Sequence, residues 1–280
     1  MCMFKKITFV IALIMMLISI KGFAIDTYGG YDVPVDIEIN GSFIKCAQKP
    51  VLIDGSAYIP LRAFSDAIGA SVEWNDKELW AKITKDGHSF VFYPEKDYCL
   101  VDGVEKNYTS VIYNNLTFVP VRAISEVLKY DVNWDDFYLT VKITAPNVEV
   151  LENCKDVSYT YEDIMYLGKI IHIESGYQPF NVKIGVGNTV INRVKSPKFP
   201  NSVKEVIFDT KYGVQFPPAH TDKFNITPSK DSIIAAKCVL CGVNVARNSL
   251  YFINSKVAPS SWAHNNRPHY ADMGGMSFYE

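Results

Sequence analysis

Residues 166–176 read YLGKIIHIESG, and the C-terminal half of the chain is organised around this stretch. Apolar residues recur at helical spacing within it and just before it: Ile164, Leu167, Ile170 and Ile171. This periodicity predicts an amphipathic helix, with Glu174 projecting from the face that should be buried. Gly176 can take the left-handed conformation that is common at helix ends, and Pro179 follows as a second stop.

The position of Glu174 bears directly on chemistry. Burial disfavours the charged form of a carboxyl group and raises its pKa. A glutamic acid that stays protonated near neutral pH can act as a general acid. The alternative is a side chain that turns out to solvent at a frayed helix end, and position alone does not separate the two.

Length and composition set the outer limits. The chain has 280 residues, 48% of them hydrophobic, which suits two modest globular domains. Its formal net charge of −2 argues against a protein held on nucleic acid mainly by phosphate contacts. We therefore expect no nucleic-acid partner.

The N-terminus has the layout of a secretory signal peptide. Lys5 and Lys6 precede an unbroken apolar run over residues 7–20, and small residues at Gly22 and Ala24 suit a cleavage site. The run is too short for a comfortable membrane span, so an uncleaved anchor is the minor reading. We expect residues 1–24 to be removed and the mature protein to be secreted.

Residues 25–146 contain an internal duplication. The segments YIPLRAFS at 58–65, VEWND at 72–76 and KIT at 82–84 return, at one constant offset, as FVPVRAIS at 118–125, VNWDD at 132–136 and KIT at 142–144. Each copy predicts an extended segment, a turn, a short strand that runs into a proline, a helix and two further strands. The first half is therefore expected to be one repeated α+β module.

These repeated phrases resemble the copper amine oxidase N-terminal-like domain, a module of secreted and cell-surface bacterial proteins. The resemblance does not imply amine oxidation, and His88 is the only histidine in residues 25–146. Arg62 and Arg122, at matched positions of the repeat, could be substrate ligands, but structural ion pairs are the commoner role. We expect a non-catalytic attachment or spacer module. Attachment to the cell wall or spore surface, contact with another protein and the absence of any ligand all stay open.

Residues 147–157 lose the periodicity and are rich in polar residues, which predicts a linker. Residues 158–280 form the second domain, which reads as mainly helical with long irregular loops. Helices are expected over residues 182–194, 203–208 and from Pro228 to Gly242, with a strand over residues 250–253. The fold class of the whole chain is thus α+β.

The second domain resembles the SleB/CwlJ family of bacterial cell-wall hydrolases, best known as spore cortex-lytic enzymes. The motifs that carry the resemblance occur in the family's order: IHIE at 171–174, VGNTVINRV at 186–194, FPNSV at 199–203, VI at 206–207, QF at 215–216 and YFIN at 251–254. The resemblance implies a lysozyme-like or lytic transglycosylase-like fold and cleavage of peptidoglycan glycan strands between N-acetylmuramic acid and N-acetylglucosamine. By motif position, it implies Glu174 as the acid.

One departure from the family's pattern bears on mechanism. The family commonly has a second glutamate four positions after the catalytic one, and this chain has Gln178 there. Ordinary glycosidases need two carboxylates across the scissile bond, whereas lytic transglycosylation needs only one. We therefore expect a lytic transglycosylase, and plain hydrolysis through a bound water is the alternative.

Sugar-binding residues are expected around the acid. The candidates are Gln215, Phe216, Tyr251, Asn254 and Trp262, because amides and phenols match sugar hydroxyl and acetamido groups, and aromatic faces match sugar rings. Phe216 and Tyr251 could equally belong to the core. The family's usual histidine before the terminal aromatic pair is replaced by Met276, so that edge of the site is expected to differ.

Two rival functions remain at this point. A metal-dependent N-acetylmuramoyl-L-alanine amidase would need a zinc-ligand set, and the candidate ligands are His172, His220, His264, His269 and Glu174. Their spacings match no usual zinc pattern, so no metal or other cofactor is expected. A non-catalytic cell-wall-binding protein is the second rival, and the intact Glu174 argues against it.

Overall fold

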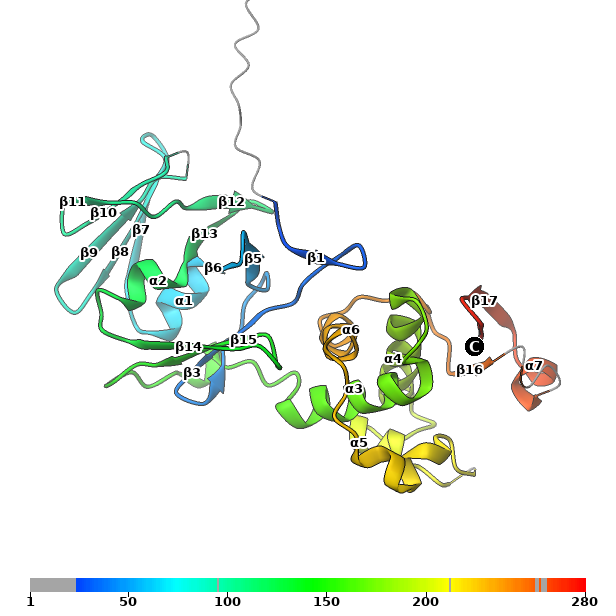
Figure 1. Cartoon of the computed structure of the whole chain (residues 1–280). Coiled ribbons are helices and arrows are strands. Elements are labelled where there is room, and N and C mark those ends of the chain that lie inside the picture. The colour runs from blue at the N-terminus through cyan, green and yellow to red at the C-terminus, as the bar shows by residue number, and fades with distance from the viewer. Residues whose placement is uncertain (1–23, 95, 212, 255–256, 258–260) are drawn as a thin grey trace, which may run out of the picture.

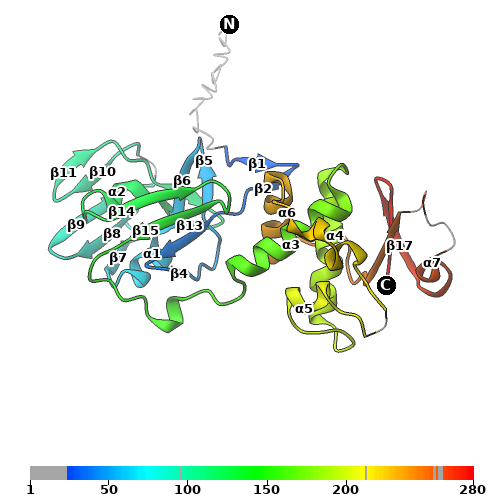
Figure 2. The same ribbon diagram turned by 60° about the horizontal axis from the view of Figure 1, so that its bottom comes forward.

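The structure is a computed structural model that describes residues 24–280, except 95, 212, 255–256 and 258–260. The expected signal peptide therefore lies outside the described residues, apart from its last position. Figures 1 and 2 place the helices of the C-terminal half between the N-terminal sheets and a small sheet near the C-terminus. No helix of the described residues is long and apolar enough to cross a bilayer. The expected α+β class is confirmed.

The N-terminal half is built from short strands and two small helices. After the hairpin β1 (Thr27–Tyr28) and β2 (Tyr31–Asp32), the elements are β3 (Asp36–Ile39), β4 (Ser42–Phe43), β5 (Val51–Ile53), β6 (Ser56–Pro60), α1 (Leu61–Ala67), β7 (Ser71–Asn75), β8 (Trp80–Lys85), β9 (His88–Phe92), β10 (Cys99–Val101), β11 (Val104–Lys106), β12 (Val111–Tyr113), β13 (Leu116–Pro120), α2 (Val121–Ser125), β14 (Asp131–Asp135) and β15 (Thr140–Thr144). They form sheets ordered β11-β10-β9-β8-β7, β12-β13-β6-β5 and β14-β15-β3-β4.

The duplication is visible in the topology. The segment β6-α1-β7-β8 has its counterpart in β13-α2-β14-β15, and β6 and β13 pair antiparallel with Ile59 opposite Val119. An unusual backbone conformation also occurs in both copies. Leu79 and Leu139, at matched positions, both have positive φ, which leucine rarely adopts. The same short sequence thus directs the same turn twice.

The segment 147–157 lies against the N-terminal half. Val150 is buried in the core of that half, and the backbone N–H of Lys45 donates to the carbonyl of Cys154 over 2.8 Å. A short 3-10 turn over Glu152–Cys154 lies within the segment. The connection between the halves is therefore packed against the first of them.

The C-terminal half is mainly helical. Its elements are α3 (Tyr161–Ser175), α4 (Phe180–Lys195), α5 (Val203–Ile207), the 3-10 turns η2 (Pro217–His220) and η3 (Asp222–Asn225), α6 (Lys230–Leu240), β16 (Tyr251–Asn254), α7 (Trp262–Asn266), β17 (His269–Met273) and β18 (Met276–Tyr279). The expected start of α6 at Pro228 is wrong, because Ser229 takes the N-cap position. The expected strand over residues 250–253 corresponds to β16, and the tail adds β17 and β18 to it in a small sheet ordered β16-β18-β17 that was not predicted.

A buried charge network joins the halves. The ammonium group of Lys237 on α6 lies 3.0 Å from the carboxylate of Asp36 on β3, with the two side chains 0% and 3% exposed. Lys49 and the hydroxyl of Tyr159 also donate to Asp36, over 3.1 and 2.7 Å. Burial alone would raise the pKa of Asp36, but the ammonium groups of Lys237 and Lys49 outweigh it and hold that pKa below its usual value.

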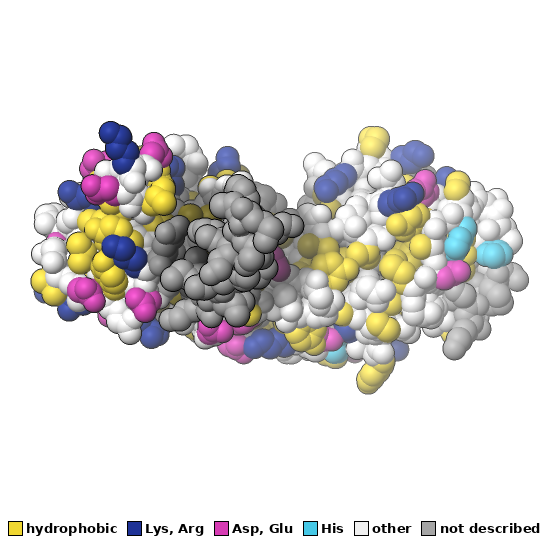
Figure 3. Space-filling view, turned by 90° about the horizontal axis from the view of Figure 1, so that it is seen from above, with side chains coloured by type: hydrophobic (Ala, Val, Ile, Leu, Met, Phe, Trp, Pro, Cys, Tyr) yellow, Lys and Arg dark blue, Asp and Glu magenta, His cyan; other side chains and the backbone are white. Residues whose placement is uncertain are grey.

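Figure 3 shows one face of the molecule, with hydrophobic side chains spread over both halves among acidic and basic ones and histidines near the C-terminal end.

Candidate active site

Helix α3, which carries Glu174, begins at a capping box. The Thr160 hydroxyl accepts from the N–H of Asp163 over 3.2 Å, and the Asp163 carboxylate accepts from the N–H of Thr160 over 2.9 Å. The apolar stripe then buries Leu167, Ile170 and Ile171 among α4 and α6. Local sequence thus sets both the start of the helix and the direction of its buried face.

The end of α3 differs from the expectation. Gly176 is right-handed, with φ −52° and ψ −37°, so the predicted left-handed stop is wrong. The buried ammonium group of Lys183 instead donates to the carbonyls of Ser175 and Gly176 over 2.9 and 2.7 Å. These are the carbonyls that a helix end leaves without partners. A lysine on the next helix therefore holds the turn beside Glu174.

Lys183 is a buried residue beside Glu174 that sequence reasoning missed. Its side chain is 2% exposed, and its ammonium group lies 3.4 Å from the carboxylate of Asp231. The only sequence signal was a lysine set inside the apolar run at 182–186, where a charged side chain needs a partner.

We expect Lys183→Met to lower the free energy of unfolding by about 2–3 kcal/mol, because the helix-end carbonyls lose a charged donor. Activity should also fall as the end of α3 loosens. Urea unfolding and a wall-digestion assay measure the two effects. Lys195→Met is the matched control, since Lys195 is an exposed lysine on the same helix and should tolerate the change. Equal unfolding curves for both variants would contradict this role.

Glu174 lies one residue before the end of α3 and is half-buried. Removal from water raises the pKa of its carboxyl group above the ordinary value, and desolvation is the cause. The side chain is therefore not fully solvated, and it forms no ion pair with any residue that the structure describes. Both properties suit a carboxyl group that must hold a proton until it is used.

The raised pKa predicts a stability effect that depends on pH. A folded-state pKa above the unfolded value means that the stabilising contribution is complete below the unfolded pKa and is lost as pH rises through the folded pKa. We therefore expect Glu174→Gln to melt at a higher temperature than the wild type near neutral pH. The difference should vanish at acid pH. Melting temperatures measured over a series of pH values check this prediction. A difference in melting temperature that does not change with pH would contradict the raised pKa of Glu174.

Gln178, the residue in place of the family's second glutamate, has a structural contact. Its side-chain oxygen accepts from the backbone N–H of Gly275 over 3.4 Å. A Cβ on Gly274 would come within 2.9 Å of the same oxygen. The amide therefore packs under the β17–β18 turn, which ties that turn to the segment after Glu174.

Two of the expected sugar-binding aromatics are brought together. The rings of Tyr251 and Trp262 meet edge to face, 5.6 Å apart. The guanidinium group of Arg267 lies 5.1 Å from the first ring and 5.0 Å from the second. Trp262 is 57% exposed, so its indole is available to a ligand. Arg267 was not predicted, because it is close to the two aromatics only after β16 and α7 have folded.

The other candidates are placed differently. Phe216 is 1% exposed, and the guanidinium group of Arg193 lies 5.1 Å from its ring, so it belongs to the core. Gln215 is partly exposed, and its amide donates to the carbonyl of Gly213 over 3.0 Å. Asn254 is partly exposed at the end of β16.

The histidines lie in different parts of the domain, except that His264 and His269 both contact the ring of Tyr279. His172 accepts from the N–H of Ser229 at the start of α6 over 3.3 Å. His264 lies 3.0 Å from the hydroxyl of Tyr279, and His269 lies 3.0 Å from Asp272. Within the described ranges, no three His, Cys, Asp or Glu side chains form a group that could hold a metal ion.

Comparison with known families confirms both expected resemblances. Residues 38–153 match the copper amine oxidase N-terminal domain, and residues 177–279 match the family described as Cell Wall Hydrolase. The second match begins just after Glu174.

Curated relatives cover the C-terminal half. The spore cortex-lytic enzyme of Bacillus cereus is 29% identical over 104 residues, which are 37% of this chain and 39% of that protein. The spore cortex-lytic enzyme of Bacillus subtilis is 26% identical over 122 residues, 44% of this chain and 39% of that protein. The chain thus spans about two-fifths of the length of these relatives.

Among solved structures, the catalytic domain of the germination-specific lytic transglycosylase SleB from Bacillus anthracis is 26% identical. The alignment covers 45% of this chain and 99% of that domain, with a TM-score of 0.41. The catalytic domain of the Bacillus cereus SleB protein is also 26% identical, with a TM-score of 0.40, and the alignment covers 45% of this chain and 94% of that domain.

Proposed function

We propose that this protein cleaves the glycan strands of peptidoglycan between N-acetylmuramic acid and N-acetylglucosamine, as a lytic transglycosylase with Glu174 as its acid and base. The match of residues 177–279 to the Cell Wall Hydrolase family and the names of the relatives support the substrate. The residues around Glu174 support the mechanism.

The observation that carries the proposal is the state of Glu174. Its carboxyl group is half-buried, and desolvation raises its pKa. Gln178, at the position where a second carboxylate is common, is an amide engaged with the β17–β18 turn. One carboxyl group at this place suffices for a reaction that uses the same group twice, first as acid and then as base.

The reaction then runs in two proton transfers. Glu174 donates its proton to the oxygen that bridges muramoyl C1 and the next sugar, and the C1–O bond breaks. As a carboxylate, it then accepts the proton of the muramoyl C6 hydroxyl while that oxygen attacks C1. The product carries a 1,6-anhydro ring, Glu174 is protonated again, and no water is consumed.

The exposed indole of Trp262, with Tyr251 beneath its edge, offers a face for a sugar ring near the C-terminal sheet. Gln215 and Asn254 supply amides for hydroxyl and acetamido groups. Phe216 acts from the core, by supporting Arg193 and with it the strand that carries Tyr251. A secreted enzyme with the N-terminal half attached to the cell wall or spore envelope fits this substrate.

Digestion of purified peptidoglycan followed by mass spectrometry tests the proposal. Anhydromuramic ends are the expected product. Reducing muramic ends would overturn the transglycosylase mechanism in favour of hydrolysis, and freed stem peptides would overturn the glycan bond as the target in favour of an amidase.

A further inference from the structure

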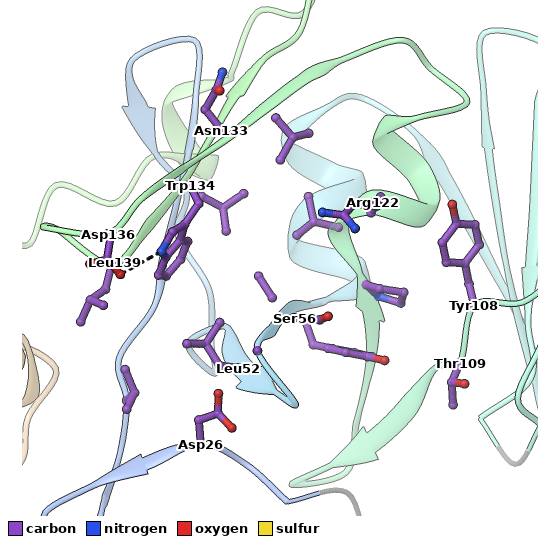
Figure 4. Close-up of a pocket in the computed structure, with 18 of the residues that line it drawn as sticks. Asp26, Leu52, Ser56, Tyr108, Thr109, Arg122, Asn133, Trp134, Asp136 and Leu139 are labelled. Carbon is purple, nitrogen blue, oxygen red and sulfur yellow. Dashed lines mark hydrogen bonds between the residues drawn. The ribbon is translucent and has the colours of Figure 1, made fainter.

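The N-terminal half contains a cavity that the proposed reaction does not use. Its volume is about 780 Å³, within the roughly 300–1,000 Å³ typical of small-ligand sites. Figure 4 shows it between the strands of the repeat, with Arg122 and Trp134 on the upper side and Asp26 on the lower. Lys230 and Ile234 of α6 add to its lining, so the cavity lies where the two halves meet.

The wall of the cavity is aromatic and polar. Tyr58, Tyr108 and Trp134 line it. The indole of Trp134 is 42% exposed, and its N–H is held by the carboxylate of Asp136 over 3.3 Å. That bond fixes the ring while leaving part of it uncovered, as a sugar-stacking platform requires.

The charged side chains in the wall of the cavity differ in how closely they are paired with opposite charges. The carboxylate of Asp136 lies 2.6 Å from the ammonium group of Lys230, and the two groups form an ion pair. Among the described residues, the one ion pair of Arg122 is a loose contact of 3.7 Å with Glu126, and its side chain is 79% exposed. Within the part of the chain that the structure describes, the carboxylate of Asp26 has no side-chain partner. The cavity thus presents a guanidinium group for an anion and a carboxylate for hydroxyl or amide donors.

We propose that this cavity is a second carbohydrate site, which binds a muropeptide: an N-acetylated disaccharide that carries a carboxylate. Trp134 stacks on a sugar ring, Arg122 pairs with the carboxylate of the lactyl group or stem peptide, and Asp26 accepts hydroxyl or amide protons. The identity of the ligand rests on the proposed function, whereas the existence of the site rests on the cavity itself.

The repeat supplies matched controls. Trp74 and Arg62 occupy the positions of Trp134 and Arg122 in the first copy, and neither lines the cavity. Trp74 is 39% exposed, close to the 42% of Trp134. If the ligand bound to the repeat in general, both members of each pair would respond to it. If the ligand binds in the cavity, only Trp134 and Arg122 should respond.

Fluorine NMR of the full chain labelled with 5-fluorotryptophan shows whether the ligand binds at Trp134. The chain has four tryptophans, so four resonances can be assigned by single Trp→Phe variants. The probe is a purified disaccharide–tetrapeptide muropeptide, added to the Glu174→Gln variant to prevent turnover. We expect the Trp134 resonance to shift with saturation and the Trp74 resonance to stay. Trp262 reports separately on the sugar-binding face proposed near the C-terminal sheet.

The outcomes are distinct. A shift at Trp262 without one at Trp134 overturns the second site and leaves the proposed function standing. A shift at Trp134 without one at Trp262 supports the second site and counts against the sugar-binding role of Trp262. Arg122→Ala should weaken the titration at Trp134 at least about tenfold, a loss of about 1.4 kcal/mol, and Arg62→Ala should not change it. An unaltered titration in Arg122→Ala would overturn the assigned role of the guanidinium group.

Discussion

Glu174→Gln is expected to lower the rate of peptidoglycan cleavage by at least about 1,000-fold, because general acid and base catalysis contributes up to about 10⁴ and one group here supplies both. The amide has the shape of the carboxyl group but cannot donate the proton that releases the leaving sugar. Release of soluble fragments from purified peptidoglycan measures the effect, and circular dichroism confirms that the variant is folded.

Glu162→Gln provides the matched control. Glu162 lies on the same helix, is exposed, and pairs with Lys204 over 3.1 Å. Losing a surface ion pair costs at most about 1 kcal/mol, so this variant should keep its activity. If Glu174→Gln retained substantial activity while folded, the assignment of the acid would be wrong.

Lys237→Met is expected to destabilise the protein by about 3–5 kcal/mol, the usual cost of leaving one member of a buried ion pair without its partner. Lys237 is fully buried and donates to the carbonyls of Tyr138 and Leu139 over 2.6 and 2.9 Å, besides its contact with Asp36. All three contacts cross from α6 to the N-terminal half. Urea unfolding measures the loss, and both halves should lose stability together.

Lys230→Met tests whether burial of the ion pair causes the loss of stability expected for Lys237→Met. Lys230 is on the same helix and also contacts the N-terminal half, through Asp136 at 2.6 Å, but both of these side chains are more than half exposed. This change should cost no more than about 1 kcal/mol. Similar losses in the two variants would mean that the buried network contributes nothing beyond a surface pair.

Local patterns were enough to predict much of this molecule. The apolar spacing around Leu167 and Ile170 gave the helix and the half-buried side of Glu174, because a helix face depends only on neighbouring residues. The two copies of the repeat were predicted to form equivalent structural units, because the elements of each copy also depend on neighbouring residues. Ser202 caps α5 through a similarly local contact, because its partner, Glu205, is three residues away.

Contacts between distant segments could not be predicted. The end of α3 depends on Lys183, which comes from the following helix, and the junction of the halves depends on Asp36 meeting Lys237. Neither pairing leaves a periodic signal. The small C-terminal sheet was missed because β17 and β18 are short and are stabilised by pairing with each other and with β16.

In the proposed mechanism, a single carboxyl group cleaves the glycan without an activated water. Digestion of purified peptidoglycan in water enriched in oxygen-18 tests it most directly, with the products analysed by mass spectrometry. We expect anhydromuramic products that contain no heavy oxygen. Reducing muramic ends that carry oxygen-18 at C1 would contradict it.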